Sequence, residues 1–144
     1  MKEKYDVVEI AQQAGHFRVF LQALETAGLT ATLKETGPYT ILAPVDDAFV
    51  KIPKAKLEDL FKTENRESLQ SLLRNHIVPG NLLSTDLKRH DEIRSMKGEQ
   101  LRIESRAGLW VNEGRVVTPD LKASNGVVHG LDTVLMFQTQ GAAA

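Results

Sequence analysis

The side chains best suited to chemistry in this chain are its four histidines, His16, His76, His90 and His129. A neutral imidazole ring can bind a metal ion or exchange a proton near neutral pH. No two of these histidines have the spacing of a His-x-His or HExxH motif, and the 144 residues include no cysteine to complete a zinc site. The sequence therefore predicts no metal site and no cofactor, and a histidine on an apolar face is interpreted as a hydrogen-bonded core residue.

The acidic pair Asp46-Asp47 offers two carboxylates of the kind that bind cations or act in acid-base catalysis. Adjacent residues at the start of a helix point in different directions, however, so the two carboxylates are not expected to meet. We interpret Asp46 or Asp47 as the N-cap of the helix that follows, with the other acid favoured in the first turn by the helix dipole.

A nucleophilic triad would require Ser124, His129 and Asp132 to converge. A strand places residues 129 and 132 on opposite faces, and the chain has no nucleophile elbow and no glycine-rich nucleotide loop. The sequence therefore predicts no catalytic residue and a protein that is not an enzyme.

The composition limits the classes of partner. A formal net charge of -1 provides no basic excess to attract nucleic acid phosphates or anionic lipid. No apolar run is long enough to span a bilayer, and the charged N-terminus lacks the apolar segment of a secretory signal. We therefore expect no nucleic acid partner, no membrane insertion and no signal peptide in this chain, whether because the protein stays inside or because a signal was removed before Met1.

Helical periodicity dominates the first half of the chain. Residues 6 to 35 are predicted to be helical, with Gly15 and Gly28 at helix ends, and a short buried strand is predicted at residues 39 to 43. Helical spacing returns in two further runs, with Asn65 as the predicted cap of the second and Pro79-Gly80 after it. The residues that carry this spacing are Phe17, Phe20, Leu21, Leu24, Leu57, Leu60, Phe61, Leu69, Leu72, Leu73, His76 and Ile77.

His76 shares the apolar face of Leu69, Leu72 and Leu73 in this pattern. We predict that its neutral ring faces the core and makes a hydrogen bond with a backbone group of a neighbouring loop. Protonation of a buried ring would then lower the stability of the fold in acid.

The second half alternates with a period of two from residue 82 onward. Turns are predicted at residues 106–108, at residues 112–115 and at Asn125-Gly126, whose residues tolerate positive φ. After that last turn the alternation places six residues on one face: Val127, His129, Leu131, Thr133, Leu135 and Phe137. Helices followed by a β-meander predict an α+β fold in one domain, residues 1–140, with residues 141–144 as a disordered tail or cloning remnant.

Three blocks of the chain together resemble the fasciclin (FAS1) family of adhesion domains. The blocks are residues 39–49, residues 75–80 and residues 124–135, and their order and separation cover nearly the whole chain. The resemblance implies that the matching motif residues are structural, as parts of core strands and caps. These residues are Thr40, Ala43, Pro44, Asp46, Phe49, His76, Pro79, Gly80, Asn125, Gly126 and His129.

The resemblance also implies a fold and a role. The fold is a β-wedge or sandwich of mostly antiparallel strands with an N-terminal helical layer, here in a single-domain form of prokaryotic style. The role is adhesion or protein binding without catalysis, in a protein that is secreted, periplasmic or at a cell surface. The implied partner is a cell-surface or matrix protein or glycan, and we expect the domain to be a monomer.

In some animal members of the family, an Asp-Ile pair and a tyrosine-histidine segment have been linked to integrin recognition. The matching positions here are Asp120-Leu121 and Asn75-His76, with asparagine in place of the tyrosine. These four residues are the predicted partner-binding residues. Beside Pro119, a carboxylate and an apolar group in a rigid turn would suit a basic or cationic pocket with a hydrophobic slot. The alternative is an ordinary loop with Leu121 in the core.

Two other functions stay open at this stage. A small hydrolase or small-ligand-binding protein would use His76 or His129 and would require a polar pocket in which solvent reaches both rings. A purely structural spacer would have no ligand of its own. Trp110, the only tryptophan, is either an anchor for a partner or a buried residue of the meander.

Overall fold

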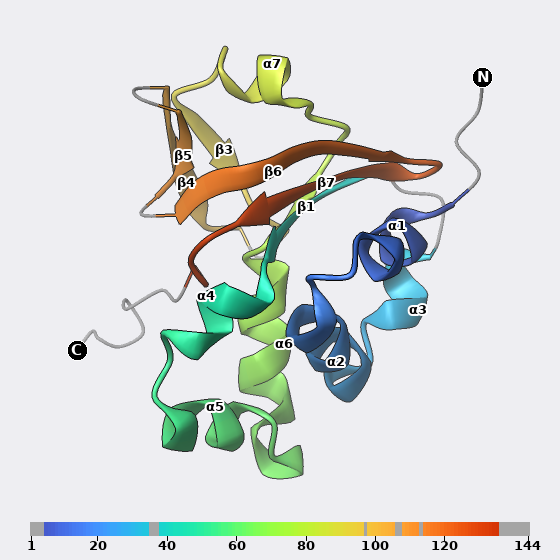
Figure 1. The fold of residues 1–144 in the computed structure, drawn as a ribbon, viewed down its shortest axis with the longest axis vertical. Helices are drawn as coiled ribbons and strands as arrows, with labels where there is room; N and C mark the ends of the chain where they lie inside the picture. The colour runs from blue at the N-terminus through green and yellow to red at the C-terminus, as the bar shows by residue number, and fades with distance from the viewer. Residues whose placement is uncertain (1–4, 35–37, 97, 106–107, 113, 136–144) are drawn as a thin grey trace.

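In the part of the chain that the computed structural model describes, six α-helices lie on one side of a seven-stranded sheet, and a short seventh α-helix lies apart from them (Figure 1). The structure describes residues 5–34, 38–96, 98–105, 108–112 and 114–135. Its helices are α1 (Val7–Ala14), α2 (Arg18–Ala27), α3 (Thr30–Leu33), α4 (Asp46–Val50), α5 (Lys54–Leu60), the 3-10 turn η1 (Thr63–Asn65), α6 (Arg66–Arg74) and α7 (Ser84–Leu87). Its strands are β1 (Tyr39–Pro44), β2 (Ile77–Pro79), β3 (Glu92–Arg94), β4 (Gln100–Ser105), β5 (Leu109–Val111), β6 (Gly114–Ala123) and β7 (Gly126–Leu131).

The first helices begin and end where the sequence supplies caps. The Asp6 carboxylate accepts the Glu9 amide at 2.8 Å and the Glu9 carboxylate accepts the Asp6 amide at 3.1 Å, which forms a capping box at the start of α1. Gly15 and Gly28 end α1 and α2 with φ angles of 83° and 77°, a left-handed conformation that glycine adopts without strain. The predicted helical region and both of its glycine ends are confirmed.

The strands form one sheet in the order β2-β1-β7-β6-β5-β4-β3. Every pair in it is antiparallel except β1 and β7, which run parallel. The amide of Met96, just after edge strand β3, donates to the carbonyl of Ile77 in the other edge strand, β2, at 2.6 Å. This bond joins the two edges of the sheet, and the predicted α+β fold with mostly antiparallel strands is confirmed.

Strands β1 and β7 form the centre of the molecule because each has a hydrophobic core on both faces. Ile41, Ala43 and Val128 belong to a core under the helices, whereas Leu42 and Leu131 belong to a second core against β3, β4, β5 and α7. All six residues of β7 are buried. Alternate residues of a strand point to opposite faces, so these two strands connect the two cores.

Several sequence predictions need correction. The alternating strand predicted to run to Phe137 ends at Leu131, although Val134 and Leu135 beyond it are still buried, and Phe137 lies outside the described residues. Helix α7 was not predicted. Asn65 occupies the N-cap position of α6, but its side-chain amide donates to the Asp59 carbonyl instead of capping the helix. The predicted tail at residues 141–144 also lies outside the described residues.

Candidate functional site

The His76 ring links the end of α6 to the segment after β7. Its Nδ1–H donates to the Leu72 carbonyl at 2.8 Å, and its Nε2 accepts the Leu135 amide at 2.9 Å. The ring is 1% exposed, and only the neutral form can donate at one nitrogen and accept at the other. Burial lowers the pKa of His76 to about 4, although the Leu72 hydrogen bond opposes that shift. The expected backbone hydrogen bond of this ring is therefore present.

The His129 ring also bonds backbone groups through both of its nitrogens, on the other face of β7. Its Nδ1 accepts the Asp120 amide at 3.1 Å and its Nε2–H donates to the Leu82 carbonyl at 2.7 Å. The residue is fully buried. Burial lowers the pKa of His129, while the Leu82 hydrogen bond and the Asp120 carboxylate oppose that shift.

Residues 80–84, which connect β2 to α7, are fastened by three polar side chains from distant strands. The buried Thr40 hydroxyl donates to the Gly80 carbonyl at 2.7 Å and accepts the Leu82 amide at 2.8 Å. His129 binds the Leu82 carbonyl, and Asp120 binds Ser84. Residues from the first and last of the three sequence blocks therefore meet at one loop.

Asp120 lies in an irregularity of strand β6, and its φ of 61° is in the left-handed region. Its carboxylate accepts the Ser84 amide at 2.7 Å and the Ser84 hydroxyl at 2.6 Å, and so caps α7. Burial would raise the pKa of Asp120, but the Ser84 bonds and the charges of His129 and Lys122 lower it below its usual value. The predicted rigid turn is thus a bulge within a strand.

The other predicted partner-binding residues differ in exposure. Leu121 is half-buried and packs against the core under the helices, as in the alternative with this side chain tucked inward. Asn75 is 2% exposed and its side-chain oxygen accepts the Ser95 hydroxyl at 3.3 Å. Asn75 and His76 are both inside the fold, and the contact of their side chains with a partner stays a prediction.

Asn125 joins the turn between β6 and β7 to the N-terminal helices. Its side-chain oxygen accepts the Val7 amide at 2.9 Å, and its side-chain NH₂ donates to the Leu33 carbonyl at 2.7 Å. Its backbone carbonyl accepts the Tyr39 amide at 2.9 Å, at the start of the parallel pairing between β1 and β7. The asparagine thus holds α1, α3 and β1 together.

Asp46 caps a helix, but not the one that follows it. Val45 occupies the N-cap of α4 and makes no side-chain cap bond, whereas the Asp46 carboxylate accepts the Val19 amide in the first turn of α2 at 2.9 Å. The Asp46 amide in turn donates to the His16 carbonyl at 2.9 Å. The N-cap of α2 is Phe17, which has no side-chain oxygen, so a distant aspartate supplies the missing acceptor.

Replacing Asp46 with alanine is expected to lower the free energy of unfolding by about 1 kcal/mol, the usual contribution of a capping side chain. Asp47→Ala is the matched control, because the neighbouring Asp47 is exposed. Urea unfolding followed by circular dichroism measures both changes. Equal losses in the two variants would contradict the capping role of Asp46.

The remaining motif residues are also parts of the framework. Ala43 and Pro44 complete β1, and Phe49 is a buried residue of α4. Pro79 is exposed at the end of β2, and Gly80 follows with a φ of 111°.

The clusters considered for catalysis do not form. Asp132 accepts the Arg115 amide and the Thr133 hydroxyl, away from His129, and it is Ser84, not Ser124, that reaches a carboxylate near His129. Both ring nitrogens of His76 and of His129 bind backbone groups inside the protein, so the requirement of a pocket with both rings open to solvent is not met. Among the described residues, no three His, Cys, Asp or Glu side chains are grouped to hold a metal ion.

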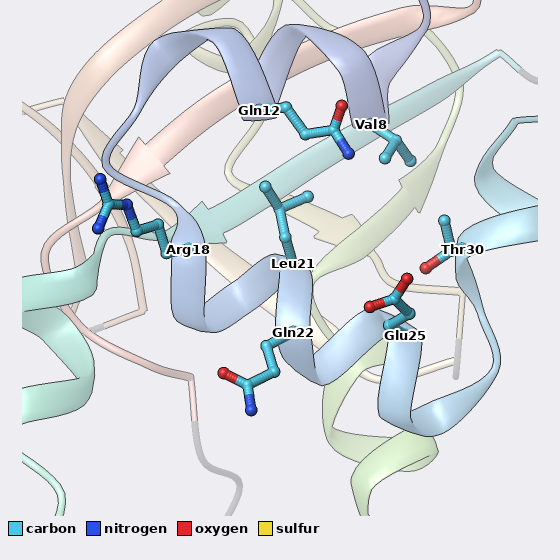
Figure 2. Close-up of a pocket in the computed structure, with 7 residues that line it drawn as sticks. All are labelled: Val8, Gln12, Arg18, Leu21, Gln22, Glu25 and Thr30. Atoms are coloured by element: carbon cyan, nitrogen blue, oxygen red, sulfur yellow. The ribbon is translucent and has the colours of Figure 1, made fainter.

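A shallow groove of about 300 Å³ lies on the outer surface of the N-terminal helices. Figure 2 shows Leu21 between the polar side chains that line it, which come from α1, α2 and α3. Its lining residues are Val8, Gln12, Arg18, Leu21, Gln22, Glu25 and Thr30. The charged residues Arg18 and Glu25 are exposed, so the groove has the character of a surface for polar contacts and not of a reaction chamber.

Comparison with known proteins identifies the family. The family model named Fasciclin domain matches residues 15–137. Two proteins of the cyanobacterium Synechocystis, sll1483 and sll1735, are 34% and 33% identical to the chain, covering 90% and 92% of it and 72% and 98% of themselves. The transforming growth factor-beta-induced protein ig-h3 of Sus scrofa is 32% identical over 90% of the chain, which spans only 19% of that longer protein.

A solved structure has the same fold. It is a FAS1 domain pair from the insect cell adhesion molecule fasciclin I, which superposes with a TM-score of 0.85 over 95% of this chain and 52% of that one, at 17% identity. No helix within the described part of this chain has the length and apolar character needed to cross a bilayer.

Proposed function

This chain belongs to the fasciclin domain family, and from that premise we propose that it is an adhesion module that binds a protein or glycan partner without catalysis. We place it at a cell surface, in the extracellular space or in the periplasm, where such a partner would be met. The module binds as a single copy. The related fold in an insect cell adhesion molecule supports this role.

The observation that carries the proposal is that the side chains suited to chemistry are buried and hydrogen-bonded inside the protein. Thr40, Asn75, His76, Asn125 and His129 are all buried, and each makes hydrogen bonds within the protein. Side chains that are buried and hydrogen-bonded in this way stabilise the fold and do not transform a substrate. Binding of a partner then falls to the residues on the outer surface.

Asp120 is the partner contact that we propose, with Leu121 supporting it from the core side. The carboxylate is half-exposed, and its two hydrogen bonds to Ser84 fix its direction before any partner arrives. A preorganised acid loses little side-chain entropy on binding, which favours contact with a basic group or a bound cation of the partner.

Attachment of cells to the immobilised domain tests the proposal, using the source organism and candidate hosts. Asp120→Asn is expected to weaken attachment about tenfold, because it removes the charge of a central contact while the amide oxygen can still accept the Ser84 amide. Asp91→Asn, at an exposed aspartate elsewhere on the surface, is expected to bind like the wild type.

The outcomes distinguish an error about the Asp120 contact from an error about the adhesion role. Unchanged attachment of the Asp120→Asn variant would place the contact elsewhere, and Arg18→Glu in the surface groove would be the next variant. No attachment of the wild-type domain to any cell type would contradict the adhesion role and favour the spacer.

A further inference from the structure

Asn125-Gly126 is the single asparagine-glycine pair in the chain. In such a pair the glycine nitrogen can attack the asparagine side-chain carbonyl, because glycine has no side chain to hinder the approach. The other asparagines, Asn65, Asn75, Asn81 and Asn112, precede larger residues. The sequence thus contains one site that is chemically suited to spontaneous succinimide formation.

The fold prevents the Asn125 side chain from taking the conformation that succinimide formation needs. Both ends of the Asn125 amide are hydrogen-bonded, to the Val7 amide and the Leu33 carbonyl, and the residue is only 8% exposed. Ring closure needs the side-chain carbon to turn toward the Gly126 nitrogen, which would break both bonds.

The backbone at this site has little room to adjust. Gly126 has a φ of 155°, and the Tyr39 carbonyl fills the space where a side chain would stand. The Asn125 carbonyl is fixed by the Tyr39 amide. The hairpin therefore cannot reach the reactive geometry without separating β1 from β7 or releasing the N-terminal helices.

We propose that Asn125-Gly126 is a deamidation site that does not react in the native fold and reacts when the domain unfolds locally or globally. The Gly126 nitrogen bonds to Cγ of Asn125 and loses its proton, and the side-chain amide leaves as ammonia, which gives a five-membered succinimide. Water then adds to one of the two ring carbonyls and opens the ring to aspartate or isoaspartate. No oxidant or reductant takes part.

The product cannot restore the native contacts. A carboxylate at position 125 has no proton to donate to the Leu33 carbonyl, so two acceptors would face each other in a nearly buried place. Isoaspartate would in addition lengthen the backbone by one carbon where the parallel register of Tyr39 and Gly126 begins. Opening followed by deamidation therefore removes a molecule from the folded population permanently.

Mass spectrometry of proteolytic peptides tests the proposal after incubation of the full chain at mildly alkaline pH, once in buffer and once in urea. In urea we expect Asn125 to react well before Asn65 and Asn81, which serve as controls within the same molecule. In buffer we expect the reaction of Asn125 to be at least about a hundredfold slower, because it must await opening of the fold.

A second measurement follows the fate of the product. Protein that has been modified in urea is expected to stay unfolded when the urea is diluted, whereas protein diluted immediately is expected to refold. Equal rates for Asn125 in buffer and urea would overturn the protection by the fold. Refolding of the modified protein to wild-type stability would overturn the permanent loss, and Asn125→Asp would then be expected to fold normally.

Discussion

Gly126→Ala is expected to lower the free energy of unfolding by more than about 4 kcal/mol, or to prevent folding. Two costs add at this position. A φ of 155° is strained for any residue with a side chain, and a Cβ atom there would overlap the backbone carbonyl of Tyr39. Backbone cannot move aside as a flexible side chain can, and this stretch of it holds β1 against β7.

Gly15→Ala is the matched control for that experiment. Gly15 also has a positive φ, of 83°, but among the described residues no heavy atom beyond its two chain neighbours stands within 4 Å of the place where its Cβ would be. Only the conformational cost applies there, about 1 kcal/mol. Urea unfolding of both variants separates the cost of the backbone conformation from the cost of steric overlap. Similar losses in free energy of unfolding would show that the Tyr39 carbonyl can move to make room for a methyl group.

The wild-type protein is expected to lose about 3 kcal/mol of stability as the pH falls to near 4, through His76 alone. An unfolded histidine binds a proton below its ordinary pKa of 6.5, whereas folded His76, with a pKa of about 4, stays neutral. The unfolded state therefore holds more protons in that interval, and stability rises with pH across it. Above pH 6.5 His76 is neutral in both states, so it no longer makes the stability depend on pH.

His129 acts in the same direction, because burial lowers its pKa as well. His76→Gln is expected to be less stable than the wild type at neutral pH and to show a shallower fall in acid. His90→Gln, at an exposed histidine, is expected to keep the wild-type pH dependence. Urea unfolding at pH 7 and about pH 5 measures these changes with little interference from carboxyl groups, and His76 is expected to account for about 2 kcal/mol of the loss by pH 5. A His76→Gln profile parallel to that of the wild type would contradict this account.

Several of the confirmed predictions rested on local patterns. The spacing of Leu69, Leu72 and Leu73 was enough to bury His76 and to turn its ring toward a backbone carbonyl one turn away. Gly15 and Gly28 end helices for a reason that resides in glycine itself. The antiparallel pairing of β5 with β6 and the hairpin at Asn125-Gly126 likewise follow from nearby residues.

Two of the errors arose where a side chain has a distant partner. Asp46 was assigned to the next helix, but the unsatisfied amide that it accepts belongs to Val19, 27 residues earlier. Asp120 bonds Ser84, 36 residues away, and no local pattern signals the short helix that begins there. A carboxylate is attracted to any unpaired amide that the fold brings near it, and sequence spacing does not reveal which one.

The parallel pairing of β1 with β7 determines when the molecule can become stable during synthesis. Residues 39–44 leave the ribosome early, but their partners at residues 126–131 are among the last described residues to be made. Until then the helices and the meander each lack the strand that both cores share, and such distant pairings form slowly. A nascent chain therefore stays open until residues 126–131 have been made, and chaperones have that whole interval in which to engage it.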